Sequence, residues 1–404
     1  MKFALYHALR SLGMPCLTKE AHGETSPEHA AHELHRAFHA NTTTWTHLCP
    51  LDRASKLPPL KFGTTEMKRF SSEELGQLFN WERLKRHHAQ ALPSLHELSQ
   101  FQWLVVRKTV ALKQDLYSRT ELVIETILNE RDPARIEPHS SHLPAPVENA
   151  LLFLLLAPWE DWIEMPEFGW RGFTLPWVYS YCDDLFVRPP LPQSARSLSW
   201  LLHGGHTPFG DVAEWDAPME LPLKDGIAQL PDLLSESAWE RLQESLSSPL
   251  FETPVAHFMV RAFLSDGIDE FLAHLTMIEA ALGTETDFFP PKMRTSHKGK
   301  GATIRMTSRV SGLLGACSEG ETYYRLFNLR SAFIHGRALQ SPISSKDRFE
   351  ARRLARRVFQ GLVIRATKEP MLSCRDDFLA NTLDQGVAMG FKATSSSGKN
   401  SPKS

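Results

Sequence analysis

The spacing of apolar residues over 255–370 is the strongest constraint on the fold, because they recur every three to four positions as in amphipathic helices. This pattern begins directly after SSPLFETP (247–254), a segment of serines and prolines that is typical of a domain boundary. We therefore expect a helical C-terminal domain over 255–370. A helical extension is expected over 371–391, and the small polar residues of 392–404 predict a disordered tail.

The chain before this boundary falls into two parts of different composition. Residues 1–130 are expected to be mostly helical, because 71–88 offers a serine cap with an acidic first turn and 94–130 has a long helical period. Residues 131–254 are rich in proline and tryptophan, which predicts short helices and irregular loops packed with the first part. Extended pieces such as GFTLPWVYSY (172–181) are expected to pair as strands. The expected fold class is mainly α, with an N-terminal region of unknown fold.

Composition predicts a cytoplasmic globular protein. The chain has 404 residues, 42% hydrophobic and 23% charged, and a net charge of −2, so the overall charge indicates no particular partner. Its five cysteines stand singly, which argues against a disulfide framework or a cysteine zinc site. The most apolar run, ALLFLLLAPW (150–159), is well short of the roughly 20 residues of a membrane span. We expect no signal peptide and no contact with a membrane.

The C-terminal domain is basic, with 18 lysines and arginines against 11 acidic residues over 255–370. The excess lies in a loop over 290–305 and in a helix expected over 346–368. Basic stripes of this kind can contact nucleic-acid phosphates, although a solvated helix face partly paired with Asp347 and Glu350 explains the helix equally well. The candidates for binding nucleic acid are Lys298 and Lys300 in the loop and Arg352, Arg353, Arg356 and Arg357 in the helix.

The segment LRSAFIHG (329–336) places a charged residue on an apolar helix face. Arg330 falls on the same face as Tyr323, Phe327 and Ile334. An unpaired buried charge costs several kcal/mol, so Arg330 must find a partner or line a cleft. The neighbouring polar stripe consists of Tyr324, Asn328, Ser331 and His335.

The geometry of a regular helix separates Arg330 from His335. Positions five apart lie about 140° apart around the helix axis, so the two residues do not share a face. The long arginine side chain, or a loosening of the helix before Gly336, is needed to bring them together.

In combination, these residues resemble the HEPN superfamily of helical ribonucleases, particularly the ApeA-like branch found in bacterial abortive-infection defence. Members carry an arginine followed four to six residues later by a histidine, as Arg330 and His335 stand here. An earlier apolar helix carries a glutamate, matched by Glu279, and a helix between them begins near an arginine, matched by Arg309. The resemblance covers 255–370. Ser331 departs from the Asn, Asp or His of many members, but the ApeA-like branch tolerates serine.

The resemblance implies a metal-independent endoribonuclease without a cofactor. His335 acts as base or acid, and Arg330 holds the phosphate while the 2′-hydroxyl attacks, so the substrate is RNA. One histidine per chain is short of a base and an acid, and the resemblance implies the remedy, a symmetric homodimer in which both arginine–histidine pairs face one cleft. Glu279 is expected to orient Arg330, with Tyr324, Asn328 and Ser331 at the cleft and Arg309 among the RNA-binding residues.

The expected biological role is a toxin-like effector of antiphage defence, in which residues 1–254 sense a trigger such as a phage product. Two alternatives stay open. In the first, the helical domain is catalytically idle and serves as an RNA-binding and dimerisation module. In the second, the N-terminal histidines form the metal site of a hydrolase, although the HExxH spacing is absent and a polar helix face explains them better. These histidines are His29, His32, His35 and His39.

Overall fold

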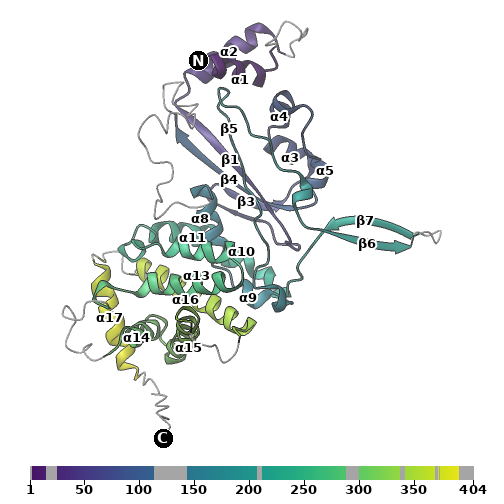
Figure 1. Ribbon diagram of the computed structural model, residues 1–404. Helices are drawn as coiled ribbons and strands as arrows, with labels where there is room; N and C mark the ends of the chain where they lie inside the picture. The colour runs from purple at the N-terminus through teal and green to yellow at the C-terminus, as the bar shows by residue number, and fades with distance from the viewer. Residues whose placement is uncertain are drawn as a thin grey trace. The chain divides into compact units, whose positions relative to one another are not determined.

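The computed structural model describes residues 2–14, 25–112, 143–206, 212–287, 300–336, 342–368, 372 and 374–390. They form two compact units (Figure 1). The N-terminal unit comprises Met1–Leu154, Trp162–Met165 and Arg171–Glu236, and the C-terminal unit comprises Leu155–Asp161, Pro166–Trp170 and Ser237–Ser404. The continuous part of the C-terminal unit therefore begins ahead of the boundary predicted at 254, and two short segments of the proline-rich region belong to it.

An antiparallel five-stranded sheet with the strand order β2-β3-β4-β1-β5 forms the centre of the N-terminal unit. The expectation that residues 1–130 are mostly helical is therefore only partly confirmed, since helices are present but four of the strands also come from this stretch. The last strand confirms that 172–181 includes extended chain. The strands are β1 (Thr42–Leu51), β2 (Leu60–Phe62), β3 (Thr65–Arg69), β4 (Gln102–Ala111) and β5 (Tyr179–Cys182).

Strand β4 shows why the helical prediction for 94–130 fails at Gln102–Ala111, whereas 113–130 lie outside the described residues. Its first half, Gln102–Val106, is buried throughout, so its apolar residues form a continuous run that fits either a helix or a strand. Val105 and Val110 are β-branched and Trp103 is aromatic, and such side chains pack well on a pleated sheet. Pairing with β1 along the whole strand then decides between the two structures.

Three helices contribute to the apolar core on one face of the sheet (Figure 1). The predicted serine cap of the first is confirmed, because the Ser71 hydroxyl accepts the Glu74 N–H at 3.1 Å and Glu74 accepts the Ser71 N–H at 2.7 Å. The helix predicted over 71–88 is divided, since Asn80 has a left-handed φ of 51°. The three helices are α3 (Ser72–Leu78), α4 (Trp81–His88) and α5 (Leu95–Leu98).

Further elements of this unit include a buried helix, α8, which holds the start of the most apolar run, as predicted. Across the ranges that the structure describes, no helix is both long and apolar enough to cross a bilayer. The elements are α1 (Lys2–Ser11), α2 (Pro27–Phe38), α8 (Ala145–Leu154), α10 (Leu230–Leu233), and a hairpin of β6 (Trp200–His206) and β7 (Val212–Pro218).

The described elements of the C-terminal unit are helical, which confirms the main sequence prediction. Helix α17 occupies most of the extension expected over 371–391, whereas the tail expected at 392–404 lies outside the described residues. The helices are α11 (Glu236–Ser245), α12 (Val255–Leu264), α13 (Gly267–Leu282), α14 (Ala302–Leu314), α15 (Cys317–Ile334), α16 (Ser345–Lys368) and α17 (Arg375–Ala388), and the short α9 (Trp159–Trp162) begins in Leu155–Asp161.

Helices α14 and α17 approach closely because glycines face the neighbouring backbone where they cross. A Cβ atom at Gly312 would collide with the carbonyl oxygen of Thr382, and one at Gly386 would collide with the carbonyl oxygen of Ser308. Backbone atoms cannot rotate away as a side chain can. The close packing of these two helices therefore depends on glycine at both positions.

We expect Gly312→Ala to lower the free energy of unfolding by about 1–3 kcal/mol, the usual cost of overpacking a tightly packed core. Urea denaturation followed by circular dichroism measures this change. Gly301→Ala is the matched control, because a Cβ there meets no atom within 4 Å. Equal urea midpoints for the two variants would contradict the close contact between α14 and α17.

Candidate active site

A pocket of about 370 Å³ lies among helices α13, α14 and α15 of the C-terminal unit. Helix α13 contributes Glu279 and helix α15 contributes Arg330, so two of the residues that the sequence singled out line the same cavity. The other lining residues are Gly283, Asp287, Ala302, Thr303, Met306, Tyr323 and Phe327.

Arg330 and Glu279 form a charged pair in this pocket. Arg330 Nη1 lies 3.1 Å from Glu279 Oε1, yet this oxygen has no hydrogen-bond partner among the described residues. The two groups are therefore at ion-pair distance without being aligned as a hydrogen bond. The guanidinium also lies 5.9 Å from the centroid of the Phe327 ring, within cation–π range. The arginine side chain is 23% exposed, which leaves it accessible from solvent.

Three polar groups in the pocket have unused bonding capacity. The Tyr323 hydroxyl, Glu279 Oε1 and Arg330 Nε are buried atoms without a hydrogen-bond partner in the part of the chain that the structure describes. Burial raises the pKa of Glu279, and Arg330 lowers it by less. Burial, together with the nearby carboxylate of Glu279, also raises the pKa of Tyr323. Such groups are typical of a site that takes a polar ligand.

Asp287 ties helix α14 to the end of helix α13. Its buried carboxylate accepts hydrogen bonds from Arg305 Nε at 2.8 Å and Arg309 Nη1 at 2.6 Å, and Arg309 also donates to the Leu282 carbonyl at 3.0 Å. Burial disfavours the charge, but the hydrogen bonds from Arg309 and Arg305 outweigh it and lower the pKa of Asp287. Arg309 is buried, so the expectation that it binds RNA is corrected: it is a structural residue.

His335 lies just beyond the last helical residue of α15, Ile334. Its backbone N–H donates to the Ser331 carbonyl at 3.1 Å, and Gly336 has a left-handed φ of 62°, as glycine often has at helix ends. The histidine is therefore not held to regular helix geometry. Its side chain is exposed, and His335 does not line the pocket that holds Arg330.

The remaining expected cleft residues also lie outside the pocket. Asn328 is exposed, and Tyr324 and Ser331 are half-buried. The end of α15 instead presents two apolar side chains to solvent, since Phe333 is 43% and Ile334 is 50% exposed. These two exposed apolar side chains stand directly before His335 in the chain.

Helix α16 does not present the predicted basic stripe, and this corrects the RNA-binding assignment of two arginines. Arg352 is fully buried, donates to the Leu155 carbonyl and lies 4.3 Å from the centroid of the Trp170 ring. Arg356 is also buried and pairs with Glu160 at 2.7 Å. Both arginines therefore bind other segments of the C-terminal unit to helix α16.

The other basic candidates lie nearer the surface. Arg353 pairs with Asp161 at 2.5 Å, and Arg357 pairs with Glu319. Asp347 and Glu350, which the sequence offered as partners for this helix, bind Arg325 instead. In the preceding loop, Lys300 is half-buried and Lys298 lies outside the described residues. The exposed arginines of α16 are thus already paired with carboxylates.

The N-terminal histidines His29, His32 and His35 lie on helix α2, and His39 caps its end. The rings of His35 and His39 lie 4.5 Å apart. Within the described ranges, no group of three or more His, Cys, Asp or Glu side chains is placed to hold a metal ion. The structure gives no geometric support for a metal centre on this helix.

Comparison with known proteins finds no match for this chain among protein-family models, curated proteins or solved structures.

Proposed function

We propose that the C-terminal unit is a metal-independent endoribonuclease of the HEPN type, with Arg330 and His335 as its catalytic residues. The observation that carries this proposal is the state of Arg330 in the pocket. Its side chain is partly exposed, and its Nη1 lies 3.1 Å from Glu279 Oε1 without a hydrogen bond between them. A phosphate offers such a guanidinium two charge-assisted hydrogen bonds in the planar geometry that it prefers. Arg330 can therefore exchange a poorly aligned protein partner for a well-aligned RNA phosphate.

The proposed reaction is an internal transfer within RNA. The 2′-oxygen of a ribose bonds to the adjacent phosphorus, and the bond from phosphorus to the 5′-oxygen breaks. His335 takes the proton of the 2′-hydroxyl, and a second, protonated imidazole gives a proton to the leaving 5′-oxygen. Arg330 neutralises the charge that develops on the phosphorus oxygens. The products are a 2′,3′-cyclic phosphate and a 5′-hydroxyl, so no metal or further reactant is needed.

The second imidazole in this proposal is His335 of a second copy of the chain. Phe333 and Ile334 support a contact at this point, because both are exposed next to the histidine. A two-fold contact at the end of α15 buries the same apolar pair from each copy and brings two histidines to one cleft. The proposed active form is therefore a homodimer.

The biological role that we propose is a toxin-like effector of antiphage defence. Its support is the resemblance of 255–370 to abortive-infection ribonucleases, together with a separate N-terminal unit that can serve as a sensor of the trigger. This role predicts that loss of Arg330 or His335 also removes protection of cells from phage.

The direct test is incubation of the purified full-length protein with total RNA and tRNA in excess EDTA. We expect cleavage, with fragments that end in 2′,3′-cyclic phosphate and cannot be ligated at the 3′ end until the phosphate is removed. Activity that disappears in EDTA and returns with magnesium, or fragments that end in a 3′-hydroxyl, would contradict the mechanism. If the protein is inert and the His335 and Arg330 variants still protect cells, the idle RNA-binding and dimerisation module replaces the proposal.

A further inference from the structure

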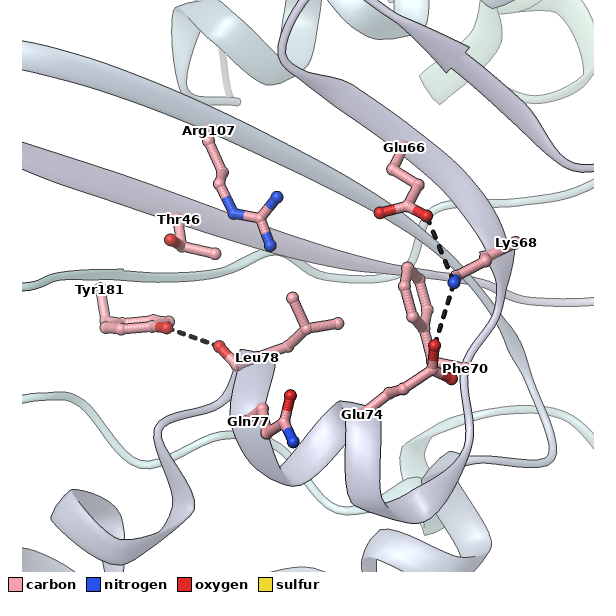
Figure 2. A pocket seen from close by; sticks show the side chains of 9 residues that line it. All are labelled: Thr46, Glu66, Lys68, Phe70, Glu74, Gln77, Leu78, Arg107 and Tyr181. Atoms are coloured by element: carbon pink, nitrogen blue, oxygen red, sulfur yellow. Dashed lines mark hydrogen bonds and ion pairs between the residues drawn. The ribbon is translucent and has the colours of Figure 1, made fainter.

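The N-terminal unit contains a pocket of about 380 Å³ on its sheet, separate from the Arg330 pocket (Figure 2). This volume lies within the range of small-molecule sites, about 300–1,000 Å³. Strands β1, β3, β4 and β5 and helix α3 all contribute to the walls. The lining residues are Thr46, Glu66, Lys68, Phe70, Glu74, Gln77, Leu78, Arg107 and Tyr181.

The strand register explains why polar residues gather here. Thr46 stands directly opposite Arg107 on one neighbouring strand and opposite Tyr181 on the other, so the three form one row across the sheet. The neighbouring cross-strand pair on the same face, two positions along each strand, is Leu48 and Val105. Both residues belong to the apolar core to which α3, α4 and α5 contribute. This face of the sheet therefore changes from apolar to polar, and the polar row faces the pocket.

One side of the pocket carries an excess of negative charge. Lys68 Nζ lies 3.0 Å from Glu74 Oε1 and 3.3 Å from Glu66 Oε1, so one ammonium group meets two carboxylates. Glu74 is further fixed by the Ser71 N–H at 2.7 Å. Figure 2 shows the second oxygen of Glu66 turned away from Lys68, toward the side of the pocket where Arg107 lies. This oxygen is placed to accept a hydrogen bond from a ligand.

The opposite side holds Arg107, whose guanidinium points into the pocket beside Thr46 and Tyr181 (Figure 2). Within the described part of the chain, Arg107 has no ion pair. The Tyr181 hydroxyl donates to the Leu78 carbonyl at 2.5 Å, and burial raises the pKa of this phenol. Tyr181 therefore stays neutral and supplies no counter-charge. Among the described residues, the pocket therefore has a positive group without an ion pair on one side and an acidic group on the other.

We infer from this arrangement that the pocket binds a small zwitterion, with its carboxylate on Arg107 and its ammonium group on Glu66. The planar arginine fork matches a carboxylate through two parallel hydrogen bonds. A doubly charged phosphate fits less well, because Glu66 and Glu74 repel it. Leu78 lies between the two sides in Figure 2 and offers apolar contact to a short aliphatic spacer. The ligand class is an amino acid or a related amino-carboxylate.

The test uses unbranched amino acids of increasing length, from glycine to aminohexanoate, as probes of the full-length protein. Binding is measured by saturation-transfer NMR and isothermal titration calorimetry, and each amino acid is compared with the carboxylic acid and the amine of the same length. We expect at least one amino acid to bind at least tenfold more tightly than its two matched compounds. Inorganic phosphate is expected to bind more weakly than this amino acid.

Variants then test which residue binds each end of the ligand. Arg107→Gln and Glu66→Gln are each expected to weaken binding at least tenfold. Lys108→Gln is the matched control, because Lys108 is the next residue of β4, is also exposed and points to the opposite face of the sheet. Its binding is expected to equal that of the wild type.

Thermal melting separates lost binding from lost folding. Arg107→Gln breaks no ion pair within the described residues, so its melting temperature is expected to match that of the wild type. Three results would overturn the inference: no saturable binding of any amino acid, an equal loss of binding in Lys108→Gln, or tighter binding of phosphate than of every amino acid.

Discussion

Replacing His335 with alanine is expected to lower the rate of RNA cleavage by about three orders of magnitude, because positioned acid–base catalysis contributes roughly 10²–10⁴-fold. Arg330→Ala is expected to lower the rate by about 10²–10³-fold, the usual effect of removing a group that stabilises developing charge. Initial rates on one defined RNA in EDTA measure both effects. Arg330→Lys keeps the charge but not the planar fork, so its rate is expected to lie between those of the wild type and Arg330→Ala.

The control for lost charge is Arg261→Ala, since Arg261 is exposed on helix α12 of the same unit. Its rate is expected to equal that of the wild type. Arg330→Ala also leaves Glu279 without its ion-pair partner, so the melting temperature of this variant must be measured beside its rate. If both alanine variants retain the wild-type rate while the wild type cleaves RNA in EDTA, other residues perform the chemistry and the assignment fails.

The contact between Arg330 and Glu279 is the part of the candidate site that the sequence predicted best. An arginine on an apolar helix face requires a counter-charge, and the resemblance pointed to Glu279 in an earlier apolar helix. The structure places the two at 3.1 Å. Helical periodicity placed Arg330 on a face that needs a counter-charge, and the family resemblance supplied Glu279 as the residue expected to provide it.

The sequence could not reveal which face of helix α16 is covered. Arg352 and Arg356 repeat at a spacing of four, as solvated arginines often do, yet both are buried. Arg352 donates to the carbonyl of Leu155, which lies 197 residues earlier in the chain. Helical periodicity indicates that a helix has two different faces, but only tertiary contacts decide which elements pack on each face.

The N-terminal sheet was missed for a related reason. The buried run in β4 satisfies helix and strand patterns alike, and its partner β1 begins with threonines that give little apolar signal. The polar row of Thr46, Arg107 and Tyr181 likewise arises only when three distant strands are paired in register. No motif in the linear sequence identifies such a site.

Asp287 was also missed, since it lies in a short turn after helix α13 and belongs to no periodic pattern. We expect Asp287→Ala to destabilise the C-terminal unit by about 3–5 kcal/mol, the usual cost of removing one partner from a buried ion pair. The side chains of Arg305 and Arg309 are only 5% and 3% exposed, and both lose their counter-ion in this variant. Urea denaturation at pH 7 measures the change. Glu285→Ala, an exposed position in the same turn, is the matched control.

The pH dependence of stability tests whether the charge of the Asp287 carboxylate accounts for this loss of stability. The pKa of Asp287 is lowered in the folded protein. Its contribution to the free energy of unfolding is therefore complete above the unfolded-state pKa of about 3.9, and it is lost as the pH falls through the folded-state pKa. The wild type and Asp287→Ala are therefore expected to differ most near neutral pH and to approach each other in acid. Asp287→Asn, which keeps the shape but not the charge, is expected to follow the alanine variant. A constant difference at all pH values would instead mean that shape, rather than the charge on Asp287, holds α14 against α13.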